Sequence, residues 1–158
     1  LDKDQTKAFN IIKKNIEGTT IELSNVQIDD GKNQAQSGNY LLTALRETSK
    51  IWLDVNKDKI IVNINVNMYC KITDQETDYT TVTPSHTIPL PKEVQLKAQQ
   101  TVSQMINSMF DKSIETECDF LDVLMKVYRR HHNYYSLYKD NFAKKMQANV
   151  VVSVQGQK

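Results

Sequence analysis

Apolar and polar residues alternate most clearly in the middle of the chain, in the stretch KIIVNINVNMYCKI. One side of the alternation holds Ile60, Val62, Ile64, Val66, Met68 and Cys70, and the other holds Asn63, Asn65, Asn67 and Tyr69. A period of two residues predicts a β-strand with one face on a core and the other facing water or a polar partner. The β-rich segment LLTALRETSKIWLDV precedes it, and only NKDK separates the two, which predicts a hairpin.

A helical period begins after Pro91 and predicts the longest helix of the chain, running to about Glu117. Its apolar stripe consists of Val94, Ala98, Val102, Met105, Ile106, Met109, Phe110 and Ile114. We expect the middle of the stripe to pack on the apolar face of the hairpin, with its two methionines in the core rather than in a ligand groove. The contacting residues would be Val102, Met105, Ile106 and Met109 on the helix and Val62, Ile64 and Val66 on the strand.

The N-terminal part of the chain predicts a helix, a strand and a loop. Apolar residues recur at helical spacing up to Ile16, Asp2 or Asp4 can cap this helix, and Gly18 stands where a helix would end. The segment TTIELSNV then predicts a strand, and DDGKNQAQSGN predicts a loop.

The C-terminal part predicts shorter helices and a final strand. TDQETDYTTVTPSHTIPLP is typical of an extended connector with room for an edge strand. CDFLDVLMKVYRRHH predicts a helix with Asp119 as its cap, and NYYSLYKDNFAKKM predicts another with Tyr135, Tyr138 and Phe142 turned inward. NVVVSVQG predicts a strand that returns to the antiparallel sheet. The order indicates an α+β fold: a mainly antiparallel sheet, a long amphipathic helix packed on one face, and shorter helices.

Composition narrows the class of protein. The 158 residues fit one domain, 1–158, and the absence of an initial Met indicates a fragment of a longer protein. Lys plus Arg number 20 against 19 acidic residues, so the overall charge gives no general attraction to nucleic acid or anionic membrane. No apolar run approaches the roughly 20 residues that cross a bilayer. Cys70 and Cys118 lack metal-site spacing, and we expect two unbridged thiols.

The stretch VYRRHHNYYSLYKDNF concentrates basic, aromatic and histidine residues and raises two functional alternatives. A small hydrolase built on the Arg129–His132 region would need a histidine beside a second catalytic group, yet the side chains of His131 and His132 diverge by about 100° on a helix. A single-stranded nucleic-acid binder would use the tyrosines beside Arg129 and Arg130, but inward-facing tyrosines and a near-neutral chain count against it. We therefore expect no enzyme and no nucleic-acid binding.

Other candidate sites are weak. His86 has no acid–base partner nearby, and Asp29, Asp30 and Gly31 resemble the start of a calcium loop that lacks its later carboxylates. No glycine-rich phosphate loop, GxSxG elbow or HExxH helix occurs. The sequence predicts no catalytic residue, no cofactor and no metal.

The order of these segments resembles the C-terminal domain of the Ger(x)C family, the C subunits of spore germinant receptors. That family pattern has a long amphipathic helix, an Asp-Ile-Phe-Gly-Phe-Gly-like motif, a basic aromatic run, a Pro and Trp segment, a second aromatic residue and a Val-rich strand. Here the motif and its aromatic positions are Asp119, Phe120, Leu121, YRRHHNYY, Tyr135 at the usual Trp and Phe142 at the second aromatic. Asp122 and Leu124 replace the motif glycines and His132 replaces the proline, so the departures concern a local turn.

The resemblance implies a non-enzymatic domain at the C-terminus of a larger germinant receptor C subunit. Family members are lipoproteins at the outer surface of the spore inner membrane, so membrane association would come from a lipid anchor outside this fragment, which itself would be soluble. The implied partners are the receptor's integral-membrane A subunit and its transporter-like B subunit, and the implied role is support of spore germination.

Without a catalytic group, function must lie on an exposed surface, and the sequence offers two. One is the basic end at Arg129, Arg130, Lys144 and Lys145, and the other is the asparagine face at Asn63, Asn65 and Asn67. We favour the basic end as a partner or membrane surface, because asparagine-rich strand faces are usually only solvated. Each basic residue near an anionic membrane contributes about 1 kcal/mol to binding.

Overall fold

The computed structural model describes residues 1–14, 19–29, 35–77, 80–81 and 89–156, and its elements follow the predicted order. The N-terminal half contains α1 (Lys3–Lys13), β1 (Thr20–Asp29), β2 (Ala35–Val55), β3 (Ile60–Thr77) and β4 (Thr80–Thr81). The C-terminal half contains α2 (Lys92–Glu115), α3 (Val123–Arg130), α4 (His132–Tyr138), α5 (Phe142–Lys145) and β5 (Met146–Gly156). This is the predicted α+β fold, with the long helix where the 3.6-residue period placed it.

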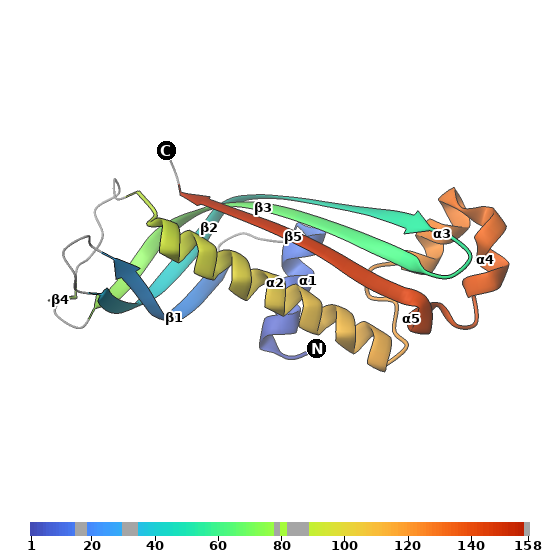
Figure 1. Cartoon of the computed structure of the whole chain (residues 1–158), viewed down its shortest axis with the longest axis horizontal. Helices are drawn as coiled ribbons and strands as arrows, with labels where there is room; N and C mark the ends of the chain where they lie inside the picture. Colours follow the sequence, from blue (N-terminus) through green and yellow to red (C-terminus); the bar gives the residue numbers. More distant parts are fainter. Residues whose placement is uncertain (15–18, 30–34, 78–79, 82–88, 157–158) are drawn as a thin grey trace.

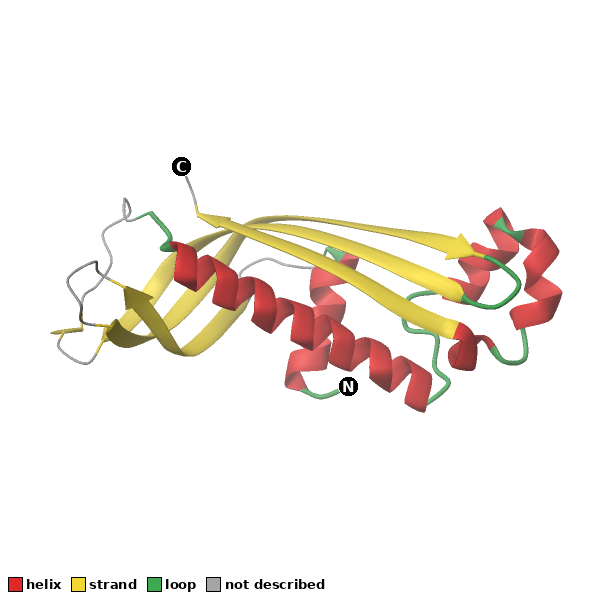
Figure 2. Ribbon diagram, in the orientation of Figure 1, coloured by secondary structure: helices red, strands yellow, loops and turns green. Residues whose placement is uncertain are grey.

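The described strands form one sheet around the long pair β2 and β3 (Figures 1 and 2). The pairs β1–β2, β2–β3 and β3–β4 are antiparallel, whereas β5 pairs parallel with β3. The final strand therefore returns to the mainly antiparallel sheet, as predicted, and its own pairing with β3 is parallel. The reason is that β5 enters the sheet where β3 begins, with Met146 beside Ile60.

The predicted hairpin is confirmed at NKDK, where one asparagine organises the turn between β2 and β3. The Asn56 backbone N–H donates to the Lys59 carbonyl oxygen at 3.2 Å. The Asn56 side-chain oxygen accepts the backbone N–H groups of Asp58 at 2.8 Å and Lys59 at 3.0 Å. These bonds provide acceptors for turn amides that have no partner in the β-sheet, which is why asparagine suits this position.

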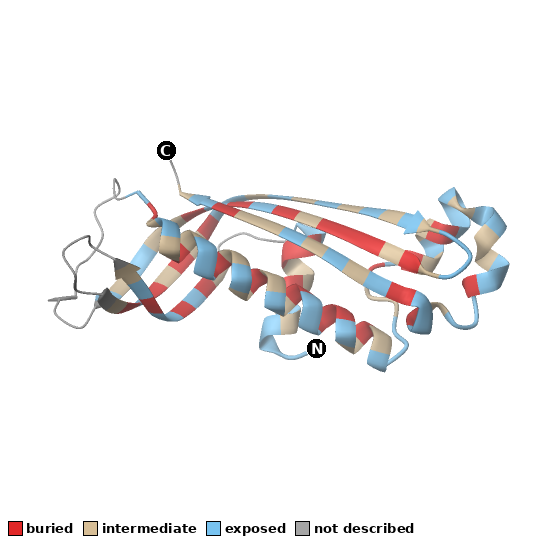
Figure 3. Ribbon diagram, viewed as in Figure 1, coloured by how far each residue is buried: buried red, intermediate tan, exposed pale blue. Residues whose placement is uncertain are grey.

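The core lies between α2 and the inner face of the sheet (Figure 3). The buried residues include most of the predicted contact set, namely Val102, Ile106 and Met109 of α2 and Val62, Ile64 and Val66 of β3. Met105 packs at the edge of this cluster and is only partly buried. The buried face of β3 and the stripe of α2 thus belong to one apolar core, in which the nearest backbone neighbours of α2 are β5, α1 and β1.

Several predicted boundaries differ from the observed ones. Helix α1 ends at Lys13 rather than near Gly18, because Lys14 turns into the left-handed region at φ 62°. Its N-terminus is a capping box in which the Asp2 carboxylate accepts the Gln5 N–H at 2.8 Å. Part of the predicted loop 29–39 is strand, because β2 begins at Ala35 and pairs with β1. Similarly, β3 extends into the predicted connector as far as Thr77, and β4 pairs with its end.

The cysteine prediction is confirmed: Cys70 is a buried free thiol and Cys118 an exposed one. Burial, with the nearby Glu47 carboxylate, raises the pKa of the Cys70 thiol to about 12, so it stays protonated. Among the described residues, no helix has the length and apolar character needed to span a membrane. The weak candidates His86, Asp30 and Gly31 lie outside the described residues.

Candidate interaction site

The two halves of β2 have different neighbours, and the candidate site lies on the second half. Strand β1 pairs with β2 from Ala35 to Thr43. From Arg46 to Val55, the structure describes a pairing partner for β2 only on the β3 side. This half of β2 is therefore an open sheet edge in the described part of the chain (Figure 1).

The hairpin turn shows which backbone groups point outward at this edge. The Asn56 N–H donates toward β3, to the Lys59 carbonyl oxygen. Because backbone groups alternate along an antiparallel strand, the N–H groups of Asp54 and Trp52 also point toward β3. The N–H and C=O groups of Leu53 and Ile51 then point toward the open edge. In the described part of the chain, no backbone hydrogen bond from these two residues to a turn, loop or cap is recorded.

Helix α3 lies beside this edge. Its N-cap residue is Asp122, and the predicted Asp119 caps the first turn with its side chain from three residues earlier. The two Asp119 carboxylate oxygens accept the N–H groups of Val123 at 2.7 Å and Leu124 at 2.8 Å. The helix begins four residues after Asp119 because Asp122 adopts a left-handed conformation at φ 54°. Asp122 is one of the positions where the Ger(x)C pattern has glycine, the residue that adopts this conformation without strain.

A cavity of about 490 Å³ lies between α3 and the open edge of β2. Its apolar wall comes from Ile51, Trp52 and Leu53 of β2 and from Met125 of α3. The side chains of Trp52 and Met125 remain 37% and 49% exposed. Large apolar side chains left in contact with water around a cavity are typical of a binding surface rather than of a core.

The charged wall of the cavity comes mainly from α3. The Asp122 carboxylate lies 3.0 Å from the Lys13 ammonium, and this hydrogen bond, with the fields of Lys13, Lys126 and Arg129, lowers the pKa of Asp122. Burial lowers the pKa of Lys126, whose ammonium donates to the Leu121 carbonyl oxygen. The one carboxylate of the cavity therefore already has a cationic partner.

Arg129 and Arg130 occupy the last turn of α3, line the same cavity and are exposed. Within the described residues, neither arginine forms an ion pair. With Lys126 they provide three cationic groups against the single carboxylate of Asp122. Since Asp122 is already paired with Lys13, the cavity has an excess of positive charge available to an anionic group.

The two neighbouring histidines have separate environments. Helix α3 ends at Arg130 and α4 begins at His132, so the expectation that both histidines lie on one helix is wrong. His131 stands at the break and lines the cavity. His132 lies against Tyr128 at 5.1 Å between ring centroids and stacks on Tyr135 at 6.5 Å. No cluster of His, Cys, Asp and Glu able to hold a metal occurs in the described part of the chain.

The tyrosines of this region are partly structural. Tyr138 is fully buried, as predicted, and its hydroxyl donates to the Asn56 carbonyl oxygen, which joins α4 to the hairpin turn. Tyr135 and Phe142 are partly buried against the core. An aromatic used for packing offers no free face for a nucleic-acid base. Tyr128 is 48% exposed, and its ring lies edge to face with His132 and Tyr135.

Only two of the four predicted basic residues line the cavity. Lys144 and Lys145 lie on α5, are exposed and do not line the cavity that holds Arg129 and Arg130. Figure 1 shows α5 at the same end of the molecule as α3 and α4, where β5 begins. The basic end is therefore an arginine pair facing a cavity and a separate lysine pair.

The asparagine face is less exposed than the sequence suggests. Asn63 is only 4% exposed, and its amide links three strands. The Asn63 nitrogen donates to the Asp54 carboxylate at 2.8 Å, and its oxygen accepts the Asn149 amide at 2.9 Å. Further along, Asn67 is exposed and donates to Asn65 at 3.3 Å. The expectation of an open polar face is thus wrong at Asn63, because side chains of neighbouring strands use its hydrogen-bonding groups.

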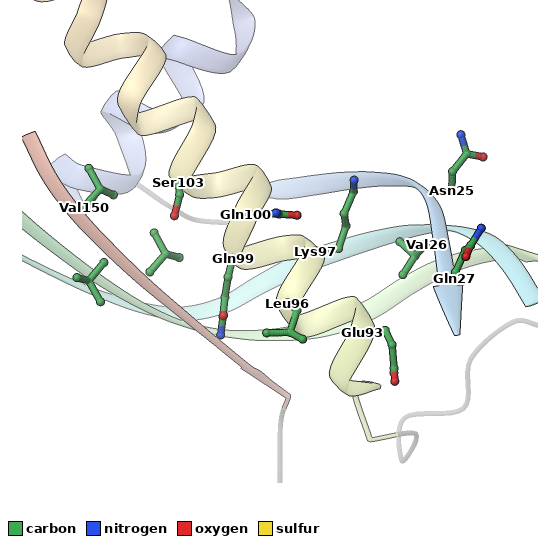
Figure 4. A pocket seen from close by; sticks show the side chains of 12 residues that line it. Asn25, Val26, Gln27, Glu93, Leu96, Lys97, Gln99, Gln100, Ser103 and Val150 are labelled. Carbon is green, nitrogen blue, oxygen red and sulfur yellow. The ribbon is translucent and has the colours of Figure 1, made fainter. Parts of the chain in front are cut away.

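A second hollow, of about 810 Å³, lies beside the N-terminal half of α2. Figure 4 shows its side chains on both sides of the helix, with Val150 of β5 on one side and Asn25 and Gln27 of β1 on the other. Its two charged residues, Glu93 and Lys97, have opposite sign. This hollow therefore lacks the excess charge of the cavity beside α3.

Sequence reasoning identified Arg129, Arg130 and His131 but missed the other residues of the cavity, which include Trp52, Met125 and Lys126. A signal for Trp52 was present, because this large aromatic residue occupies the outward-facing, otherwise polar side of β2. The signal for Met125 and Lys126 was weaker, since any exposed helix face carries such residues. Their importance follows from the position of α3 beside the strand, which the sequence does not specify.

Comparisons with known proteins agree with this architecture. The family model described as "Spore germination B3/ GerAC like, C-terminal" matches residues 1–157. The chain is similar to the crystal structure of the GerBC protein, with a TM-score of 0.68 and 14% sequence identity. That match covers 100% of this chain and 46% of the GerBC chain, so the chain spans about half of that protein. No curated protein sequence matches the chain. The chain belongs to the Spore germination B3/GerAC-like C-terminal family.

Proposed function

We propose that the chain is the C-terminal domain of the C subunit of a spore nutrient germinant receptor and that it works by binding rather than by catalysis. The observation that carries this proposal is the family match over residues 1–157. The likeness to GerBC adds support at the level of the fold. A binding role requires an exposed surface, and the cavity beside α3 provides one.

Within that role, the partners are the A and B subunits of the receptor, and the parent protein is held by a lipid anchor at the outer surface of the spore inner membrane. We place the contact at the basic end. Arg129 and Arg130 form its centre because they face a cavity with apolar walls and have no ion-pair partner in the described structure. Lys144 and Lys145 add a second positive area on α5, suited to longer-range attraction.

The first test is made in spores that carry the parent gene. Deleting residues 1–158 from the parent should abolish germination in response to the receptor's nutrients, with the A and B subunits still present at normal levels. Normal germination after this deletion would contradict the proposed function. A hydrolase activity that disappears in His132→Ala, or submicromolar and salt-dependent binding of an oligonucleotide, would also contradict it.

The second test asks whether the basic end is the contact surface, which the deletion does not address. The double variant Arg129→Glu/Arg130→Glu should impair germination while leaving the melting temperature of the chain nearly unchanged, because both side chains are exposed. The matched control Lys92→Glu/Lys97→Glu makes the same change of charge on exposed residues of α2. Normal germination in the arginine variant, at normal receptor levels, would contradict the basic end.

A further inference from the structure

We propose that the open edge of β2 beside α3 receives an extended, acidic segment of a partner protein, which adds to the sheet as a further strand. This inference rests on the proposed function and names the chemistry of the contact that it requires. It combines three features at one place: backbone groups without a partner in the described structure, a cavity with one apolar wall, and an excess of positive charge. Addition of a strand to a sheet edge is a common mode of peptide recognition.

The backbone supplies the first part of the argument. The outward N–H and C=O groups of Ile51 and Leu53 form the portion of the edge that lines the cavity. Natural sheets usually protect such edges with charges, bulges or covering elements, because an open edge pairs with other chains. Arg46 and Lys50 provide charge along the first part of the open edge. At residues 51–53 the side chains of the edge are apolar, and the Lys50 ammonium lies over the Trp52 ring, 5.8 Å from its centroid.

The side chains supply the second part. Trp52 and Met125 leave apolar surface in contact with water on either side of the cavity, which a bound strand would cover. Arg129 and Arg130 would meet carboxylates of the bound segment through charge-assisted hydrogen bonds. Asp122 would not repel them strongly, because its own carboxylate is held by Lys13 at 3.0 Å.

The same features argue against other occupants. A second copy of the chain, paired edge to edge, would bring its own arginine pair and Lys126 toward the same positive region, and like charges repel. An anionic membrane would attract exposed basic side chains, but a membrane surface does not supply the ordered donors and acceptors that an edge strand needs. An acidic segment in extended conformation offers both: its backbone pairs with the outward N–H and C=O groups of β2, and its carboxylates pair with the arginines.

Trp52 provides a direct probe, because it is the only tryptophan in the sequence and it lines the cavity. The ligand is a synthetic peptide of about ten residues, the length of the open half of β2, with Glu and Thr alternating and both ends blocked. We expect a saturable change in Trp52 fluorescence that weakens with added salt. A peptide with Lys in place of Glu should produce no such change.

Amide hydrogen exchange tests whether the bound peptide pairs with the edge of β2, independently of charge. On binding of the acidic peptide, the exchange of the outward Ile51 and Leu53 amides should slow, because they gain hydrogen-bond acceptors. The amides of Trp52 and Asp54 point toward β3 and should exchange at the same rate with and without peptide. This pair of controls lies on the same strand and needs no mutation.

The arginine pair is tested by the same charge reversal as above. Arg129→Glu/Arg130→Glu should weaken peptide binding by about tenfold or more, whereas Lys92→Glu/Lys97→Glu should leave it unchanged. Melting curves of both variants would show that the chain remains folded. Restored binding of the Lys peptide by the arginine variant would confirm that the charges meet directly.

Four outcomes would overturn the inference. They are no binding of the acidic peptide, binding without protection of the Ile51 and Leu53 amides, preferential binding to vesicles that contain phosphatidylglycerol, and a peptide-independent dimer that protects those amides. The last two would assign the surface to a membrane and to a second copy. None of these four results contradicts the proposed function by itself. If deletion of the domain abolishes germination, the proposed function is supported even when the strand-addition inference is wrong.

Discussion

The two halves of β2 show how one strand can serve both a core and a surface. In the first half, β1 and β3 pair with the strand on both sides, and Tyr40 and Leu42 are buried. In the second half, only β3 pairs with it in the described structure, and Ile51 and Leu53 are partly buried beside a cavity. Pairing on both sides completes the hydrogen bonding of a strand, whereas a single neighbour leaves alternate groups available.

The difference extends to the helices that cover each region. Helix α2, the longest described helix, packs its apolar stripe into the main core. The far end has the shorter helices α3, α4 and α5, whose exposed residues include Tyr128 and Leu137. Fewer buried contacts at that end imply lower local stability, and binding surfaces are commonly found in such regions. We therefore expect the two halves of β2 to respond differently to the same substitution.

The largest expected effect compares one residue type in the two halves. Leu42 is 0% exposed, and Leu42→Ala should reduce the free energy of unfolding by about 2–5 kcal/mol through lost burial and a cavity. Leu53 is partly buried beside the open edge, and Leu53→Ala should cost roughly half as much. Denaturant unfolding measures both values. Equal losses would mean that the second half of β2 is as tightly packed as the first.

An intermediate effect concerns Glu47, on the inner side of β2 in its open half. Both Glu47 carboxylate oxygens are buried, without a hydrogen-bond partner in the described structure. Burial raises the pKa of Glu47 to about 7 from an ordinary 4.5, an effect that the nearby Lys14 reduces. The folded state therefore keeps the proton that the unfolded state loses, so stability should fall as pH rises from about 4.5 to 7 and stay lower above that range.

The variant Glu47→Gln is neutral at every pH and removes this source of pH dependence. From pH 5 to pH 8, the free energy of unfolding of the variant should rise by about 1 kcal/mol relative to that of the unmodified chain. This value is smaller than the full pKa shift implies, because Glu47 is only partly buried and solvent screens its charge. Unfolding curves at the two pH values measure the change. Glu22→Gln is a suitable control, since Glu22 is exposed on β1. A variant that follows the pH profile of the unmodified chain would contradict the assignment to Glu47.

The last effect, similar in size to that of Glu47, concerns the turn that positions α3 beside the open edge. Asp122 has a φ of 54°, so Asp122→Gly relieves backbone strain while losing the exposed ion pair with Lys13. Asp122→Ala loses the same ion pair but keeps the strain. The glycine variant should therefore be more stable than the alanine variant by about 1 kcal/mol in denaturant unfolding. Equal stability would indicate that the turn relaxes when Asp122 is replaced.

Local patterns in the sequence determined much of this molecule. The alternation from Ile60 to Cys70 predicts the strand and its buried face, because side chains in a strand alternate whatever lies around them. The stripe from Val94 to Ile114 predicts α2 for the equivalent reason with a helical period. Asp119 could be identified as a cap because its hydrogen bonds span only four and five residues.

Only the tertiary structure decided the features that depend on residues distant in the chain. The parallel direction of β5, the burial of Asn63 by Asp54 and Asn149, and the position of Trp52 beside α3 are not specified by any local period. The basic residues were visible in the sequence, but the position of Arg129 and Arg130 at a cavity, with Lys144 and Lys145 on another helix, was not. The physical reason is that pairing and packing join segments whose separation along the chain carries no information about their distance in the fold.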